Sequence, residues 1–262
     1  MDYREIRREK KIRNRKVKRS ITIVFFVIIF LLWGIYYLLQ SDLLNLKELE
    51  VYGNHMITKE EILRTPELSI ERNIFQYKPS HIKHQIELHP YVEEAHIKRK
   101  LPATIIITVK EREKYAIIPY MGSFIYIDHN KVVLEVSDDY LAEDLVLITG
   151  VAFNSFKIGD KLDISNEELL DRAMEYIEAS KIVSIADIIS EINIDQEGYI
   201  KLITFDGIEF LLSNREDPAY TILALKEVLT NLYATNKKNV IVDMRYKGQI
   251  SIRSREQWEE DR

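Results

Sequence analysis

The sequence contains no cysteine, and only eight glycines and six prolines among its 262 residues. Disulfide bonds are therefore excluded, and so is a thiolate acting as a nucleophile or a metal ligand. The folded part of the chain has to be stabilised by its hydrophobic core. A hydrophobic content of 46%, with 10% aromatic residues, is enough to form such a core and argues against extended disorder.

The short motifs of the common enzyme classes are absent as well. There is no glycine-rich phosphate loop, nucleophile elbow or dinucleotide-binding fingerprint. Ser80 and Lys83 have the S-x-x-K spacing of penicillin-interacting enzymes, but Ser80 follows a proline, as a residue at a helix start does, and no Lys-Thr-Gly or Ser-Asp-Asn motif follows. Neighbouring acids such as Glu93 and Glu94 point apart on a strand, unlike the paired acids of a glycosidase. We expect no enzyme, no cofactor and no small-molecule substrate.

Four of the six histidines lie close together, at His81, His84, His89 and His96. The first two are three residues apart on a predicted helix and could face one metal ion. The other two lie beyond the end of that helix, and no H-E-x-x-H motif joins the four. Surface positions are the interpretation that we adopt, and we expect no metal site.

The longest hydrophobic run is ITIVFFVIIFLLWGIYYLL, residues 21–39, and it has no charged residue. As a helix it is about 28 Å long, at about 1.5 Å per residue, which is enough to cross the hydrocarbon core of a bilayer. Trp33, Tyr36 and Tyr37 lie toward its C-terminal end, where aromatic rings favour the membrane–water interface. A cleaved signal peptide would have a shorter apolar core and a small-x-small cleavage site, which residues 38–41 do not supply. The sequence predicts one membrane-spanning helix that stays attached.

Charge predicts the orientation of this helix. Residues 1–20 carry ten basic and three acidic side chains, a net charge of +7, whereas the other 242 residues carry 27 basic and 39 acidic ones. Basic residues next to a span keep that end in the cytoplasm. We expect Lys16, Lys18 and Arg19 to contact anionic lipid headgroups and not nucleic acid, and the chain after Gln40 to be extracytoplasmic.

Residues 43–112 carry the signals of a small unit with the order strand, helix, helix, strand, strand. Thr58 and Glu61 have the spacing of a capping box at the start of the first helix. The second helix is expected to bury Ile82, Ile86 and Leu88. The strand candidate at residues 92–100 and the β-branched run at residues 103–110 are the last two strands.

This unit resembles a POTRA domain, as in the FtsQ/DivIB family of bacterial division proteins. The matching residues are Val51 to Asn54, Thr58 to Ile62, Asn73 to Phe75, Pro90 to Val92, Ala95, Leu101 with Pro102, and Val109 to Arg112. A basic tail and a single span directly ahead of the unit strengthen the resemblance. The chain departs from the family pattern at Glu71 and Arg72, where glycine is frequent, and at Glu113 and Lys114, where proline is frequent.

After Arg112 the sequence pattern is dominated by strands. Residues 124–134 predict a hairpin, with Asn130 expected to take a positive φ in its turn. Helices are predicted from Ser165 and from Pro218. Further strands are predicted at residues 145–150, 188–194, 199–204, 208–212, 239–244 and 249–253. This half also resembles the FtsQ/DivIB family, above all in the sequence VDMRY at residues 242–246.

The predicted fold class is α+β: an N-terminal transmembrane helix, a POTRA domain (β-α-α-β-β), and a second mixed α/β domain with a largely antiparallel sheet. The expected boundaries are 1–20 for a basic cytoplasmic tail, 21–39 for the transmembrane helix, 43–112 for the POTRA domain, 113–254 for the distal β domain and 255–262 for a charged C-terminal tail.

The resemblance implies a partner-binding surface near the chain end. In relatives, the region after the Asp-x-Arg-Tyr motif engages single-pass partners of the division complex, and an open sheet edge can pair with a strand from another protein. The alternative is an edge blunted by Lys247, Arg253 and Arg255. The residues expected to bind the partner are Arg245, Tyr246, Gly248, Gln249, Ile250, Ser251, Ile252 and Arg253.

The function that the resemblance implies is that of a non-enzymatic scaffold, anchored in the cell membrane at the division septum. Its expected partners resemble FtsL and FtsB/DivIC, with a septal penicillin-binding protein as a further candidate, and it would help to recruit or regulate septal peptidoglycan synthesis. The alternatives are a POTRA-containing chaperone component of a protein secretion system, which would accept unfolded strands along its sheet, and a membrane-tethered wall enzyme.

Overall fold

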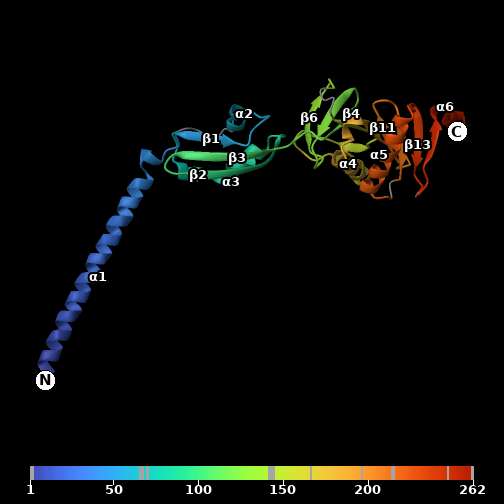
Figure 1. Ribbon diagram of the computed structural model, residues 1–262. Helices are drawn as coiled ribbons and strands as arrows, with labels where there is room; N and C mark the ends of the chain where they lie inside the picture. The colour runs from blue at the N-terminus through green and yellow to red at the C-terminus, as the bar shows by residue number, and fades with distance from the viewer. Residues whose placement is uncertain are drawn as a thin grey trace. The chain divides into compact units, whose positions relative to one another are not determined.

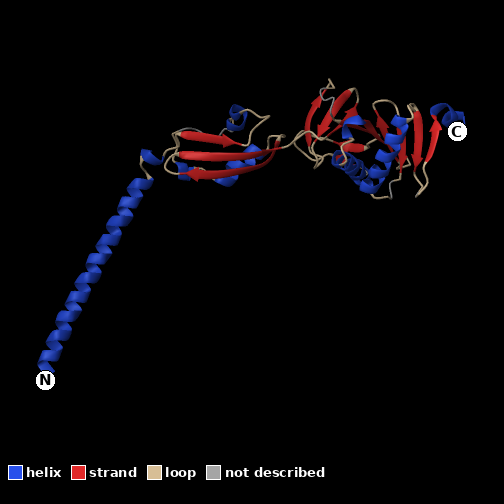
Figure 2. Cartoon of the chain, viewed as in Figure 1, coloured by secondary structure: helices blue, strands red, loops and turns tan. Residues whose placement is uncertain are grey.

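The structure is a computed structural model that describes residues 3–64, 68, 71–140, 145–165, 167–195, 197–213, 216–246 and 248–260. Its contacts divide the chain into two compact units. Unit 1 comprises Met1–Glu87 with Glu94–Lys110, and unit 2 comprises Leu88–Glu93 with Glu111–Arg262. Figure 1 follows the chain by residue number, and Figure 2 shows the helices and strands of each unit.

Unit 1 begins with helix α1 (Tyr3–Leu39), drawn blue in Figure 1. The basic residues therefore continue the apolar helix within one element. Within α1, the stretch Lys18–Leu39 has a mean hydropathy of 2.6, and none of it is buried inside the protein; it is the one helix of this kind in the described parts of the chain. Apolar surface of this length calls for a lipid environment, so α1 is consistent with a single membrane anchor.

The folded part of unit 1 is built on a three-stranded sheet. Its strand order is β1-β3-β2, and β1 (Glu48–Tyr52) runs parallel to β3 (Thr104–Glu111), with Glu48 opposite Thr104. Strand β2 (Val92–Lys100) lies on the other side of β3. The remaining elements are η1 (Asp42–Leu44), α2 (Lys59–Leu63), η2 (Ile74–Gln76) and α3 (Pro79–Glu87). The predicted β-α-α-β-β order is confirmed.

Helices α2 and α3 bury the residues that face the sheet. The capping box is present, because Thr58 accepts from the Glu61 N–H and the Glu61 carboxylate accepts from the Thr58 N–H. Ile82 and Ile86 are each 2% exposed, as predicted. The prediction for Leu88 is wrong: this side chain is 61% exposed, because α3 ends at Glu87 and the helical periodicity ends with it.

Unit 2 is built on a nine-stranded sheet with the order β14-β13-β12-β11-β10-β7-β4-β5-β6. The β4–β7, β7–β10 and β12–β13 pairs are parallel and the other five pairs are antiparallel, so the sheet is mixed and largely antiparallel. The strands are β4 (Ala116–Tyr120), β5 (Ser123–Ile127), β6 (Val133–Ser137), β7 (Val146–Thr149), β10 (Ile189–Ile194), β11 (Ile200–Thr204), β12 (Glu209–Leu212), β13 (Val240–Met244) and β14 (Ser251–Ser254).

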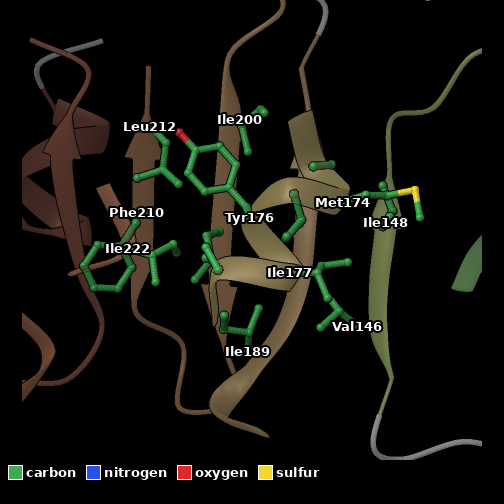
Figure 3. Packing of buried hydrophobic residues seen from close by; sticks show 14 of the residues in the cluster. Val146, Ile148, Met174, Tyr176, Ile177, Ile189, Ile200, Phe210, Leu212 and Ile222 are labelled. Carbon is green, nitrogen blue, oxygen red and sulfur yellow. The ribbon is translucent and has the colours of Figure 1, made fainter. Parts of the chain in front are cut away.

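Two long helices cover one face of this sheet. They are α4 (Glu167–Ile182) and α5 (Pro218–Ala234), and Asp217 caps α5 by accepting from the Tyr220 N–H, as expected for Pro at the first helical position. Figure 3 shows Met174, Tyr176 and Ile177 of α4 among apolar side chains of the central strands. The Tyr176 ring is fully buried, and its hydroxyl donates to Ser213 O at 3.0 Å, so the polar end of the ring is satisfied.

Smaller elements complete unit 2. They are β8 (Phe153–Ser155), β9 (Asp163–Ile164), η3 (Ala186–Ile188) and α6 (Arg255–Glu260). Strands β8 and β9 form a separate antiparallel pair. Residues 255–260, expected only as a charged tail, form the short helix α6 against β13 and β14.

The turn of the β5–β6 hairpin differs from its prediction. The residue with a positive φ is Lys131 (φ 66) and not Asn130. Asp128 holds the turn, because its carboxylate accepts from the N–H groups of Asn130 and Val132. The Lys131 side chain is buried and its ammonium contacts Glu167 and Asp171 of α4, so these tertiary contacts offset the backbone cost of a left-handed lysine.

Strand β4 was not predicted from the sequence, and it contains Pro119. Proline cannot donate to a strand ladder and therefore argues against a central strand. The β4–β7 pairing is limited to Ala116 and Ile117, so Pro119 lies beyond it and pairs only with Phe124 of β5.

Gly150, directly after β7, and Gly207 have similar positive φ angles, so replacing each by alanine gives a matched test of packing at the end of β7. An added Cβ at Gly150 (φ 77) would lie 1.9 Å from Ile194 O, whereas at Gly207 (φ 83) no heavy atom lies within 4 Å. Gly207→Ala should cost about 1 kcal/mol through backbone strain. Gly150→Ala should cost about 1–3 kcal/mol more, because the clash forces β7 away from β10. Urea unfolding of the two variants measures the difference, and equal losses would contradict the clash.

The ion pairs of Lys131 predict an acid dependence of stability. Hydrogen bonds from Lys131 and Lys161 lower the pKa of the Glu167 carboxyl from 4.5 to about 2. A carboxyl with a depressed pKa contributes stability that is fully present above pH 4.5 and is lost as the pH falls toward about 2. Lys131→Met should make the fall in unfolding free energy across this window shallower. Lys157→Met, which removes an exposed pair with Asp160, is the control. Equal slopes in wild type and Lys131→Met would contradict the prediction.

Candidate functional site

The nine-stranded sheet has two edges, and they differ. At the β6 edge, the loop before β9 adds hydrogen bonds, since Val133 N donates to Asp160 O and Gly159 N donates to Val133 O. At the other edge, β14 has β13 as its only neighbouring strand in the described part of the chain. An edge strand of this kind offers unpaired backbone groups to another strand. The candidate site is therefore the β14 edge.

The residues predicted to bind a partner lie along this edge. Gly248 (φ 72) and the hydrogen bond from Gln249 N to Tyr246 O form the turn before β14. Tyr246 is 65% exposed, Ile250 is 50% exposed and Ile252 is 45% exposed. Ser251 and Arg253 are also exposed. Lys247, expected to blunt the edge, lies outside the described residues.

The register of the last strands assigns each side chain to a face of the sheet. Ile252 pairs with Val242, whose side chain belongs to the core beneath α4 and α5, so Ile252 lies on the helix-covered side. Arg253 pairs with Ile241, and Ile241 pairs with Glu209. Arg253 therefore lies on the opposite face of the sheet.

On this opposite face, Arg245 is fixed by its own strand. Its Nε donates to Asp243 Oδ1 at 2.9 Å and its Nη2 donates to Asp243 Oδ2 at 2.7 Å. Burial raises the pKa of the Asp243 carboxyl, but the hydrogen bonds from Arg245 outweigh it and hold the pKa below its ordinary value. The same hydrogen bonds raise the pKa of the Arg245 guanidinium. Both groups stay charged at neutral pH, as a bidentate pair requires.

Three aromatic rings surround the guanidinium of Arg245. Its Cζ lies 5.3 Å from the ring centroid of Tyr199 and 5.9 Å from those of Tyr246 and Trp258. Trp258 also contacts Arg253, whose Cζ is 5.6 Å from the ring centroid. Arg245 therefore holds the rings together through cation–π contacts, while Tyr246 presents most of its surface to solvent.

A cavity of about 440 Å³ lies beside this cluster, on the face opposite α4 and α5. Its lining combines apolar and charged side chains from β11, β12, β13 and α6. Arg255 donates from Nη2 to Glu209 Oε1 at 2.6 Å, but its buried Nε has no acceptor among the described residues. A bound carbonyl or carboxylate oxygen would satisfy this N–H.

Sequence reasoning missed three residues of this site: Tyr199, Arg255 as a cavity residue, and Trp258. Residues 255–262 were assigned to a charged tail, and Arg255 to the blunting of the edge. The signal that could have located the site is Trp258 itself, a large aromatic residue within an otherwise charged segment, because such a side chain needs an apolar surface to contact.

Ser80 with Lys83 was the candidate catalytic pair of the sequence, and the four neighbouring histidines were its candidate metal ligands. The Lys83 ammonium lies 3.4 Å from the carboxylates of Glu87 and Glu94. Burial lowers the pKa of Lys83, but the two carboxylates raise it above its ordinary value, which makes this lysine a poor general base for Ser80. Among the described residues, no group of three His, Cys, Asp or Glu side chains could hold a metal ion.

The residues expected at the membrane interface all lie on α1. Lys16, Lys18 and Arg19 are exposed before the apolar stretch. Near its other end, the rings of Trp33 and Tyr37 are 4.8 Å apart in an edge contact, and the Tyr36 hydroxyl accepts from Gln40 Nε2 at 2.9 Å. These two groups of residues bracket the candidate span, as interface residues do.

Comparisons with known proteins agree with this architecture. Residues 44–112 match the family model "POTRA domain, FtsQ-type". The cell division protein DivIB of Clostridium tetani is 36% identical over 45% of this chain and 44% of its own length. DivIB of Clostridium acetobutylicum is 28% identical over 80% of this chain and 83% of its own length. The cell division protein FtsQ of Syntrophotalea carbinolica is 27% identical over 65% of this chain and 60% of its own length.

A solved structure is also similar to part of the chain. It is the major extracytoplasmic domain of DivIB from Geobacillus stearothermophilus, with 16% identity, a TM-score of 0.29, and coverage of 47% of this chain and 97% of that one. The sequence matches are the basis of the assignment: the POTRA model covers the folded part of unit 1, and the C. acetobutylicum relative extends through most of the chain. Residues 44–112 are thus similar to an FtsQ-type POTRA domain, and the sequence matches support the FtsQ/DivIB family of bacterial cell-division proteins.

Proposed function

We propose that this protein is a non-enzymatic scaffold of the bacterial division machinery, anchored by α1 with its N-terminus in the cytoplasm, that binds other single-pass division proteins at the β14 edge. The partners resemble FtsL and FtsB/DivIC, and through them the protein helps to recruit or regulate septal peptidoglycan synthesis. The observation that carries the proposal is an exposed edge strand beside an aromatic cluster and a cavity.

The two faces of the β14 edge favour a strand from the partner. Backbone pairing supplies affinity in strand addition, and the side chains of the added strand alternate between the two faces of the sheet. On one face they would meet Ile252, and on the other they would meet Arg253 and the cavity at Trp258. The unsatisfied N–H of Arg255 favours an acidic or carbonyl group at the cavity end.

A single anchor makes modest contacts at this edge sufficient. When two proteins are held in the same membrane at the septum, the effective concentration of one at the other is far above its value in free solution. Weak strand addition then gives a high occupancy without a large buried interface. This arrangement fits a scaffold that has to assemble and disassemble with each division.

A substitution at Tyr246 tests whether the β14 edge is the surface that binds the partners. Tyr246→Glu should weaken binding of the FtsL- and FtsB/DivIC-like partners about tenfold or more, because interface tyrosines are frequent hot spots and a carboxylate resists burial. Tyr220→Glu is the matched control, since Tyr220 is 67% exposed on α5, which covers the face of the sheet opposite to the aromatic cluster. Affinity for the purified partners is the measurement, with circular dichroism as the check on folding. Unchanged binding by a folded Tyr246→Glu protein would exclude this edge as the partner surface.

Arg245 tests the role of the ion pair with Asp243. Arg245→Lys keeps the charge but loses the bidentate geometry and the cation–π contacts of the guanidinium with three rings. We expect partner affinity to fall about fivefold to tenfold, while the free energy of unfolding changes by less than about 1.5 kcal/mol. Binding equal to wild type would show that the aromatic cluster does not depend on Arg245.

A further inference from the structure

The end of α1 is attached directly to the folded part of unit 1. Helix α1 ends at Leu39, and Leu44, the first buried residue of the folded part, follows after residues 40–43. The five Cα–Cα steps from Leu39 to Leu44 can span at most about 17 Å when fully extended, and η1 shortens this connection further. The polar headgroup region is itself about 5–8 Å thick on each side of a bilayer. The connection is therefore short enough to keep the start of the folded part at or close to the headgroups.

Hydrogen bonds identify which part of unit 1 lies there. The last carbonyl of the span, Leu39 O, accepts from Asn73 Nδ2 at 2.7 Å. Backbone hydrogen bonds join residues 71 and 72 to the segment just before β1. Leu46 N donates to Arg72 O at 2.9 Å, and Glu71 N donates to Leu46 O at 3.1 Å. Residues 71–76 are thus joined to the end of the membrane helix, although they follow it by more than 30 positions.

The side chains at this end of unit 1 suit an interface between lipid and water. Three large apolar side chains are exposed there: Leu43 at 53%, Phe75 at 47% and Leu101 at 62%. The turn that holds Leu101 lies at this end because Lys47 N donates to Ala103 O at 2.9 Å. We call Leu43, Arg72, Phe75 and Leu101 the juxtamembrane collar. Trp33 and Tyr37 of α1, which favour the interface, lie about two to three helical turns before Leu43 in the sequence.

Arg72 is the cation of the collar. It is exposed, its Nε donates to Gln76 Oε1 at 3.1 Å, and its guanidinium lies 5.6 Å from the ring centroid of Tyr77. A cavity of about 760 Å³ lies between this arginine and the end of α1, lined by Leu39, Gln40, Asn45, Glu71, Arg72, Asn73, Phe75 and Gln76. Glu71 is the acidic group of the lining, and Asp42 accepts from Asn45 nearby. A fixed arginine between apolar side chains matches a phosphate that has acyl chains beneath it.

We propose that the juxtamembrane collar binds the bilayer surface, with Arg72 on a phospholipid phosphate and Phe75, Leu43 and Leu101 against the upper acyl region. This contact would hold unit 1 against the membrane, whereas a free tether would let it swing about the end of α1. The proposal depends on α1 spanning the bilayer and is independent of partner binding at β14.

The absence of native cysteine allows a direct test on the full chain. Phe75→Cys carries a fluorophore in one sample and Met56→Cys carries it in the control. Met56 is in the same unit and 57% exposed, but it follows the opposite end of β1. Both proteins are placed in lipid nanodiscs that contain a phospholipid with a nitroxide quencher on its headgroup. We expect quenching at position 75 to exceed that at position 56 at least twofold. Equal quenching at the two positions overturns the proposal.

A second variant tests the phosphate contact. Arg72→Gln in the Phe75→Cys background should lower quenching by about half, because the collar then loses its cation. Arg64→Gln, an exposed arginine at the end of α2, is the matched control and should leave quenching unchanged. Undiminished quenching with Arg72→Gln removes Arg72 from the proposed contact. If the label at position 75 becomes shielded from solvent only after division partners are added, this face of unit 1 binds protein. That result would overturn the proposal that it binds the bilayer, but it would not affect the proposed interface at β14.

Discussion

The packing of α4 and α5 against one face of the nine-stranded sheet is the constraint on which the rest of unit 2 depends. Both helices bury their apolar stripes there, so the main core of unit 2 lies on this side of the sheet. On the opposite face, Lys201 of β11 and Glu209 and Leu211 of β12 line the cavity, together with residues of the short helix α6. The layered arrangement thus creates both the edge and the cavity of the candidate site.

Charge pairs organise the polar parts of unit 2 in the same way. Lys131 joins the β5–β6 turn to α4, and Arg245 joins the end of β13 to the rings of Tyr199 and Trp258. Each pair is partly shielded from water, where its geometry is held and its interaction is stronger than at a fully exposed site. The ion pair of Arg245 with Asp243 therefore acts as a support for the aromatic cluster, in which the Tyr246 ring is exposed.

The two units use their ends for different purposes. Unit 1 is joined to the membrane helix through Asn73 and a connection of only a few residues, whereas unit 2 exposes its edge strand near the C-terminus. The attachment depends on the hydrogen bond from the Asn73 side chain to Leu39 O at the end of α1, and the exposed edge depends on a sheet in which β14 has one neighbouring strand among the described residues.

The sequence by itself determined the elements with strong local signals. The uncharged run at residues 21–39, the capping box at Thr58 and the Asp217–Pro218 helix start depend on hydropathy or on hydrogen bonds between near neighbours, which sequence spacing reports directly. Tertiary structure decided what depends on distant residues. Lys131 adopts a left-handed conformation because α4 supplies its partners, and Pro119 is tolerated because the pairing of β4 with β7 stops at Ile117. Trp258 becomes part of the site because α6 folds onto β13 and β14. No local pattern encodes these contacts, because each depends on how separate elements pack together.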